Sequence, residues 1–133
     1  MTARYMLDTN ICIYTIKNRP PELREKFNSL ADQLCISAIT LGELIYGAEK
    51  SERPVENLAV AEQFAARLEV LPFSDAAAAH FGQIRAALER AGRPVGAYDL
   101  MIGGHARSEG LILVTNNMRE FKRMDGLRLE NWV

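Results

Sequence analysis

Four polar residues lie where this 133-residue chain is most apolar, and their types are those that bind divalent cations. Each lies within or just after an apolar run: Asp8 after 5–7, Glu43 within 39–46, Asp99 within 97–102 and Asn117 after 111–116. A carboxylate near a core is costly unless it is paired, and no Lys or Arg lies within these runs. Because Mg²⁺ and Mn²⁺ prefer oxygen ligands, the pattern predicts a metal site suited to hydrolysis.

Each of these residues also has a purely structural explanation. Asp8 is placed to cap a following helix, and Thr40–Glu43 matches a capping box. The positive end of a helix dipole would favour Asp99, and Asn117 alone is typical of a turn. As a set, however, acids at one sheet edge would repel one another by about 4 kcal/mol per close pair at an effective dielectric near 20. A bound cation would remove this penalty.

Strand and helix signals alternate along the chain. Strands are predicted at 4–7, 34–37, 70–71 and 111–114. Helices are predicted over 11–17, from Pro21 to Leu30, around 41–48, from Pro54 to about Leu68, after a Ser74 cap as far as Gly92, and after Tyr98. This order predicts one α/β domain over residues 1–133, with a mainly parallel sheet between helical layers. In such folds the site lies beyond the carboxyl ends of the strands, where Asp8 and Asn117 fall.

Composition and motif content exclude several classes of protein. Hydrophobic residues make up 48% and charged residues 25%, as in globular proteins. No apolar run approaches the roughly 20 residues that span a bilayer, and no secretion signal is evident, so we expect a cytoplasmic location. Cys12 and Cys35 are predicted to be buried thiols, and His80 and His105 lack a zinc spacing. A nucleophile elbow and a phosphate-binding glycine loop are both absent from the sequence.

The charge pattern leaves room for a local basic surface. A net charge of −1 argues against a protein that wraps nucleic acid over its whole surface. The later part of the sequence nevertheless carries a candidate basic rim, which consists of Arg85, Arg90, Arg93, Arg107, Arg119, Lys122, Arg123 and Arg128. A solvated helix surface explains the same residues. The Gly103-Gly104 pair in the last predicted helix would allow that helix to approach the sheet closely.

Several segments together carry a family resemblance. They are Met6–Ile11, Thr40–Gly47, Gly92–Ile102 and Val114–Asn117 followed by Arg119–Phe121. In these segments the chain resembles a PIN-domain ribonuclease, specifically a VapC-type toxin of a bacterial type II toxin–antitoxin pair. The resemblance implies a three-layer α/β/α sandwich and an endoribonuclease that needs Mg²⁺ or Mn²⁺ to hydrolyse RNA phosphodiester bonds. Residues 92–98 are similar to those of VapC toxins that cut initiator tRNA in the anticodon stem-loop, which would inhibit translation.

The resemblance also implies the site residues. It assigns catalysis and metal binding to Asp8, Glu43 and Asp99, with supporting roles for Thr9 and Thr115. The fourth family position is often aspartate and here falls on Asn117, which removes one charge and would weaken a second metal site. The metal would activate water and stabilise charge on the phosphate. The basic rim would then position the RNA backbone, and contacts with unpaired bases would determine which RNA sequence is recognised.

Partners follow from the same resemblance. A cognate antitoxin would lay its C-terminal segment along an apolar groove, and a basic side chain of that segment would reach the acids and displace the metal. Candidate lining residues are Leu23, Phe27, Leu58 and Phe64, although burial in the core explains these residues equally well. A homodimer and a hetero-oligomer with the antitoxin are also implied. Two other functions are compatible with the sequence: a PIN-like module that binds RNA or protein without cutting, and a metal-dependent phosphatase that acts on a small molecule.

Overall fold

A parallel sheet of five strands forms the middle layer of the protein, which we describe for residues 3–133 from a computed structural model. The strands are β1 (Tyr5–Leu7), β2 (Leu34–Ser37), β3 (Glu69–Leu71), β4 (Ile112–Val114) and β5 (Arg128–Glu130). Their spatial order is β3-β2-β1-β4-β5, and every pair is parallel. The central strand β1 therefore has β2 on one side and β4 on the other, and Met6 pairs in register with Cys35 and with Leu113.

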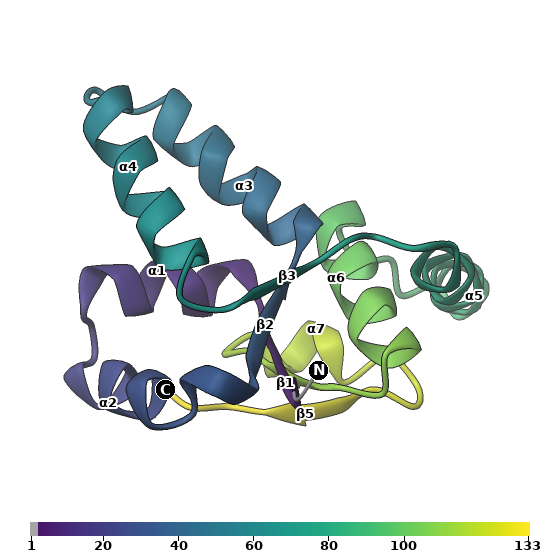
Figure 1. Ribbon diagram of the computed structural model, residues 1–133. Coiled ribbons are helices and arrows are strands. Elements are labelled where there is room, and N and C mark those ends of the chain that lie inside the picture. The colour runs from purple at the N-terminus through teal and green to yellow at the C-terminus, as the bar shows by residue number, and fades with distance from the viewer. Residues whose placement is uncertain (1–2) are drawn as a thin grey trace.

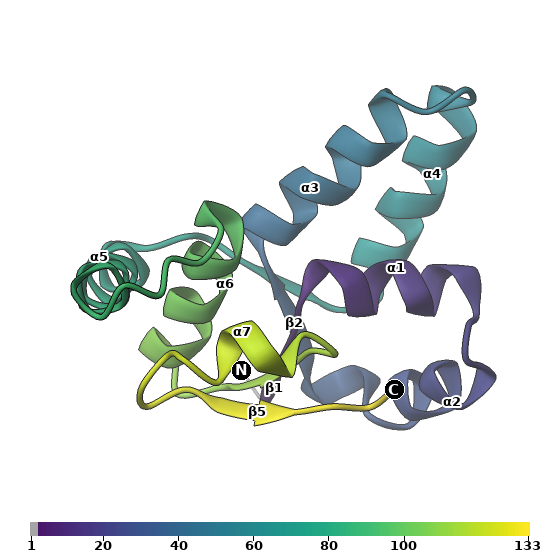
Figure 2. The same ribbon diagram turned by 180° about the vertical axis from the view of Figure 1, so that it is seen from behind.

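Helices cover both faces of this sheet (Figure 1). They are α1 (Thr9–Lys17), α2 (Pro21–Ser29), α3 (Ala38–Glu49), α4 (Pro54–Ala65), α5 (Asp75–Arg90), α6 (Ala97–Ser108) and α7 (Met118–Phe121), with a 3-10 turn at Ala31–Gln33. Helices α1, α2 and α4 lie on one side of the sheet, and α5 and α6 lie on the other, as both views show (Figures 1 and 2). The predicted three-layer α/β/α sandwich is confirmed. No helix among the described residues is long and apolar enough to cross a membrane.

The alternation of side chains along β1 divides the core into two halves. Leu7 faces the first half, which contains Phe27 and Phe64 with their rings stacked 5.3 Å apart. Met6 faces the second half, which α5 and α6 cover and which contains Leu100. Because successive strand residues point to opposite faces, a short apolar strand supplies both halves at once. The buried thiols predicted at positions 12 and 35 lie one in each half.

Two elements near the C-terminus were not predicted from the sequence. Strand β5 is short and only half-buried, so it lacks the continuous apolar run of β4. It pairs with β4 in parallel, and the chain then runs toward α2 (Figure 2). Beyond β5, Trp132 packs edge-on against Tyr5 with ring centroids 5.2 Å apart. Helix α7 has a single turn, which is too short for its periodicity to be detected.

The expected close approach of Gly103 and Gly104 to the sheet is wrong, because their neighbours lie elsewhere. A Cβ atom on Gly104 would lie 2.7 Å from the backbone nitrogen of Phe81, so this glycine lets α6 touch α5. A Cβ atom on Gly103 would instead meet Met124. The absence of a side chain at position 104 therefore sets the distance between the two helices of the second layer.

We expect Gly104→Ala to destabilise the protein by about 1–3 kcal/mol, since its methyl group would clash with the backbone of α5. Gly82→Ala is the matched control, because Gly82 also lies in a helix but a Cβ atom there meets nothing within 4 Å. That change should stabilise the protein by up to ~1 kcal/mol through helix propensity. Urea denaturation measures both, and equal effects of the two changes would contradict the packing argument.

Candidate active site

Asp8 lies directly after β1 and caps α1 with one of its two carboxylate oxygens. Oδ1 accepts a hydrogen bond of 2.9 Å from the Ile11 backbone N–H, and Oδ2 accepts one of 2.5 Å from the Thr115 hydroxyl. The side chain is only 3% exposed, and burial raises the pKa of Asp8, although both hydrogen bonds oppose the rise. Asp8 is therefore both a helix cap and a buried carboxylate, so its structural explanation does not compete with a role in a site.

Thr115 is brought to Asp8 by the register of the sheet. Leu7 pairs with Val114, and the Asp8 backbone N–H donates to the Val114 carbonyl at 3.0 Å. The next residues of the two strands therefore lie side by side. Thr115 also accepts a 2.9 Å hydrogen bond from the Asn117 backbone N–H, so one hydroxyl links Asp8 to the turn that follows β4.

Glu43 faces Asp8 from the second turn of α3. The capping-box explanation for Thr40–Glu43 is wrong, because α3 begins at Ala38 and the Ser37 hydroxyl caps it by accepting from the Ile39 N–H at 3.1 Å. Glu43 instead accepts a 2.6 Å hydrogen bond at Oε1 from the Thr9 hydroxyl. Thr9 directly follows Asp8, so this bond holds the Glu43 carboxylate beside the end of β1. The charge of Glu43 contributes to the rise in the pKa of Asp8.

Asp99 lies in the first turn of α6, and other acidic side chains surround it. Its pKa is raised to about 6, first by burial, then by the carboxyl of Glu120 through hydrogen bonding and charge, and then by Asp8 and Glu43. The carboxyl groups of Asp8, Glu43 and Glu120, from three separate parts of the chain, therefore all act on Asp99. The structure thus brings together the three acids predicted from the sequence.

Glu120 was not predicted as a site residue. It lies on α7, three residues after Asn117, and Asn117 donates a long, 3.5 Å hydrogen bond from Nδ2 to Glu120 Oε2. Asn117 therefore lies in the group as expected, but the acid in this part of the site is Glu120. The sequence signal that could have identified Glu120 was the Arg119–Phe121 segment of the family resemblance. Because no helix was predicted there, that segment did not indicate that the Glu120 side chain points toward the site.

Among residues 3–133, no Lys, Arg or His side chain forms an ion pair with these acids. The ion pairs found within residues 3–133 are Arg53 with Glu56 and Arg85 with Glu89, and neither involves the four carboxyl groups. The two thiols also play no part, since burial raises the pKa of Cys12 and raises that of Cys35 to about 12. The acid group therefore carries more negative charge than its surroundings balance.

The donor set suits a hard divalent cation. The group offers carboxylate oxygens, although within residues 3–133 no three Asp, Glu, His or Cys side chains lie close enough together to hold a metal ion as they stand. Magnesium commonly binds through one or two carboxylates and retains several waters, so an open group of this kind fits it better than it fits zinc. His105 is engaged elsewhere, because its Nδ1 lies 2.8 Å from Ser37 Oγ.

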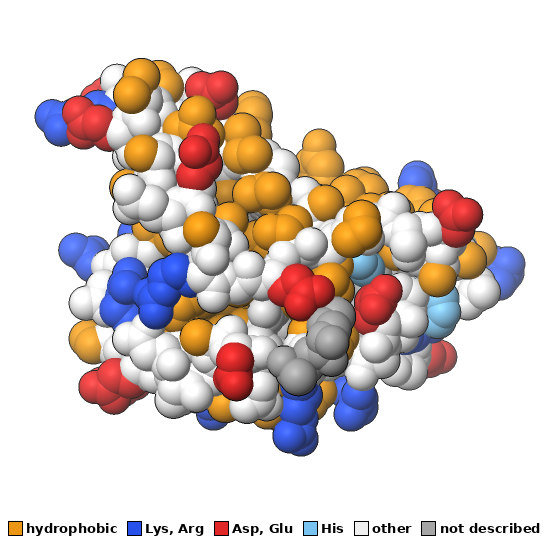
Figure 3. All heavy atoms as spheres, viewed as in Figure 1, with side chains coloured by type: hydrophobic (Ala, Val, Ile, Leu, Met, Phe, Trp, Pro, Cys, Tyr) orange, Lys and Arg blue, Asp and Glu red, His pale blue; other side chains and the backbone are white. Residues whose placement is uncertain are grey.

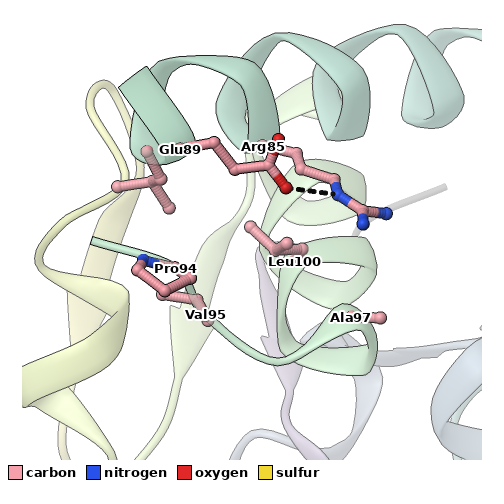
Figure 4. A pocket seen from close by; sticks show the side chains of 7 residues that line it. Arg85, Glu89, Pro94, Val95, Ala97 and Leu100 are labelled. Carbon is pink, nitrogen blue, oxygen red and sulfur yellow. Dashed lines mark hydrogen bonds and ion pairs between the residues drawn. The ribbon is translucent and has the colours of Figure 1, made fainter. Parts of the chain in front are cut away.

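Part of the predicted basic rim is occupied within the protein. Arg85 pairs with Glu89 at 3.1 Å beside a pocket between α5 and the 94–97 segment (Figure 4). Arg107 donates to His80, to Gln83 and to the Asp125 carbonyl, and Arg128 donates to the Gly110 carbonyl. The rim residues closest in sequence to the acids are Arg119, Lys122 and Arg123, which lie within or just after α7.

The apolar groove expected from Leu23, Phe27 and Phe64 is wrong, because all three side chains are buried in the core. Leu58 is half-buried. A groove does run between α1, α3 and α4, and Ile13, Ile16, Leu44, Gly47, Val60 and Ala61 line it together with Glu43. Hydrophobic side chains gather on the surface over α3 and α4 (Figure 3). The apolar surface thus reaches one of the four acids.

The arrangement of fold and acids agrees with a family match. The PIN domain matches residues 5–127, and the chain therefore belongs to the PIN-domain family. Within that family its relatives are VapC proteins. A protein of Shigella flexneri named tRNA(fMet)-specific endonuclease VapC is 63% identical and covers 97% of this chain and 98% of its own length. Ribonuclease VapC2 of Haemophilus influenzae (strain Rd) is 56% identical, with 98% of each chain covered.

Solved structures show the same similarity. The DNA-bound VapBC complex from Salmonella typhimurium contains a chain with a TM-score of 0.95 and 60% identity, covering 98% of this chain and 99% of that one. The VapBC2 complex from Rickettsia felis, bound to a DNA fragment from the promoter, contains a chain with a TM-score of 0.91 and 41% identity. This match covers 97% of the present chain and 98% of that one. The resemblance stated from the sequence is therefore confirmed along nearly the whole chain.

The raised pKa of Asp99 predicts a pH-dependent stability of the metal-free protein. Between its ordinary value of 3.8 and about 6, the folded chain holds this proton more tightly than the unfolded chain does. The free energy of unfolding therefore falls as pH rises through this window. Asp99→Asn removes the effect, so its stability relative to wild type should rise by about 2 kcal/mol from pH 4 to pH 7.5, allowing for the partial exposure of Asp99.

Urea denaturation in the presence of a chelator measures this difference. Asp125→Asn is the control, because Asp125 is exposed and lies outside the acid group. A stability difference between Asp99→Asn and wild type that stays constant with pH would contradict the charge coupling.

Proposed function

We propose that this chain is the toxin of a type II toxin–antitoxin pair and a divalent-metal-dependent endoribonuclease. The observation that carries the proposal is the group of four carboxyl groups without a cationic partner in the described residues, at the edge of the sheet where α/β folds bind ligands. The substrate we propose is initiator tRNA, cut in the anticodon stem-loop so that translation stops. The name of the 63%-identical relative supports this choice of RNA.

We infer that Mg²⁺ or Mn²⁺ binds through Asp8 and Asp99, with Glu43 and Glu120 contacting metal-coordinated water. When bound, the metal lowers the pKa of a water molecule and stabilises negative charge on the phosphate. Glu120, in place of Asn117, supplies the fourth acid, and the Asn117 amide orients it.

The surrounding residues fix these acids and move the proton. Thr115 and the Ile11 N–H hold both oxygens of Asp8, and Thr9 holds Glu43, so neither carboxylate has to reorient when RNA binds. Asp99 or Glu43 accepts the proton of the attacking water.

The proposal extends to organisation and partners. The whole chain acts as one PIN domain in the cytoplasm, where its tRNA substrate is found. A cognate antitoxin binds it, which the similarity to VapBC complexes supports. We further propose that the pair assembles around a homodimer of this chain. The antitoxin segment occupies the groove between α1, α3 and α4, from which a basic side chain can reach Glu43.

The direct test incubates antitoxin-free protein with total bacterial tRNA, with and without Mg²⁺ or Mn²⁺. We expect one discrete product that requires both the metal and Asp99, with Asp99→Asn reducing cleavage by at least about 100-fold because it removes a metal ligand. Sequencing the product ends identifies the bond. Cleavage that persists in Asp99→Asn would indicate a contaminating nuclease, and folded protein that binds metal but cuts no RNA would favour the non-catalytic module.

The fourth position has its own test. Glu120→Gln keeps the size of the side chain but removes its charge, and it should weaken Mn²⁺ binding and lower kcat by about 10- to 100-fold. Asn117→Asp, which adds a charge beside an existing acid, should not tighten Mn²⁺ binding. Calorimetric titration with Mn²⁺ separates the two, and tighter binding by Asn117→Asp would restore Asn117 as the fourth metal position.

A further inference from the structure

A buried hydrogen bond connects the helix that carries Glu43 with the helix that carries Asp99. His105, on α6, places its Nδ1 2.8 Å from Oγ of Ser37, the last residue of β2. Both side chains are fully buried. Among the hydrogen bonds found in residues 3–133, no other one links α6 to β2 or α3. The contact therefore joins two layers of the protein through polar atoms that water does not reach.

Ser37 also fixes the start of α3. Its hydroxyl oxygen accepts from the Ile39 N–H at 3.1 Å, so the atom that contacts His105 is the atom that caps this helix. Glu43 lies six residues after Ser37, and Asp99 lies six residues before His105. A shift at the Ser37–His105 contact would thus be transmitted along two short, rigid helical segments to two of the four acids.

Stability alone does not explain a histidine at position 105. Its Nε2 is buried and has no hydrogen-bond partner. Burial lowers the pKa of His105, with an opposing contribution from Glu109, so the ring is neutral at physiological pH. Phe73 packs against the ring in a T-shaped arrangement at 5.4 Å. Replacing both partners of a buried hydrogen bond by apolar groups is often neutral or stabilising, so an apolar pair would serve packing equally well.

We propose that Ser37 and His105 are positioning residues that hold α3 and α6, and with them Glu43 and Asp99, at the separation the site requires. The inference rests on the proposed function and deepens it. Residues that orient metal ligands commonly change metal affinity or activity by about 10- to 100-fold when they are removed. A displacement of about 1 Å in a catalytic group has an effect of similar size.

A matched pair of substitutions at His105 tests the proposal. His105→Leu and His105→Asn introduce side chains with the same number of non-hydrogen atoms and the same branching, but only asparagine can hydrogen-bond Ser37. We expect His105→Leu to lower kcat and Mn²⁺ affinity about tenfold, with KM for the RNA close to wild type. The free energy of unfolding should also fall, because the buried Ser37 hydroxyl loses its partner. His105→Asn should retain both properties within about threefold.

The Ser37 end of the bond provides a second measurement. Ser37→Ala also removes the cap of α3, so it should lower kcat by at least a similar factor. The double variant Ser37→Ala with His105→Leu should be no worse than Ser37→Ala, since both changes remove the contact between Ser37 and His105. Losses that multiply in the double variant would overturn the shared role. If His105→Leu does not fold, kcat and Mn²⁺ affinity are compared between Ser37→Ala, which loses the hydrogen bond, and His105→Asn, which can keep it.

The remaining outcomes separate this inference from the proposed function. Equal behaviour of His105→Leu and His105→Asn, whether both are active or both impaired, would overturn the positioning role, because only one of them keeps the bond. Asp99→Asn is measured in the same assays as a control for the proposed function. If Asp99→Asn abolishes cleavage and metal binding while the His105 pair behaves alike, the positioning role alone fails. If Asp99→Asn changes neither, the proposed function fails and the inference fails with it.

Discussion

The site depends on the hydrogen bonds that the two oxygens of Asp8 accept. One oxygen caps α1 and the other accepts from Thr115, so a single carboxylate joins the start of a helix to the ends of two adjacent strands. The parallel register of β1 and β4 makes this possible, because it brings the residues after both strands to the same edge. The cap energy, typically ~1 kcal/mol, helps to offset the cost of burying the charge. Stability and site geometry thus share the same atoms.

The acidic side chains of the site lower the stability of the fold. Burial and mutual repulsion raise the pKa values of Asp8 and Asp99, which means that the ionised group destabilises the metal-free protein. A core selected only for stability would separate such charges or pair them with Lys or Arg. Here the side chains that contact the acids are hydroxyls and an amide, which orient carboxylates without neutralising them. The negative charge is therefore available to a cation.

Much of this arrangement could be predicted from the sequence. The strands at 34–37 and before Asp8, the Ser74 cap and the Asp8 position follow from local patterns, and the structure agrees. Patterns failed where tertiary contacts decide. Glu43 fits a capping box by spacing, but Ser37 starts α3 three residues earlier, so Glu43 turns to Thr9. Glu120 lies on one helical turn, and the neighbours of Gly104 become known only once α5 is placed.

The two halves of the protein meet at the acids in different ways. Helices α1 and α3 present Glu43 at the end of an apolar groove, whereas α6 and α7 contribute Asp99 and Glu120 from the opposite layer. Glu43 is therefore the acid that the groove lining and the acid group have in common. Because Glu43 lies on α3 and Asp99 lies on α6, the relative placement of these two helices sets the distance between their carboxyl groups.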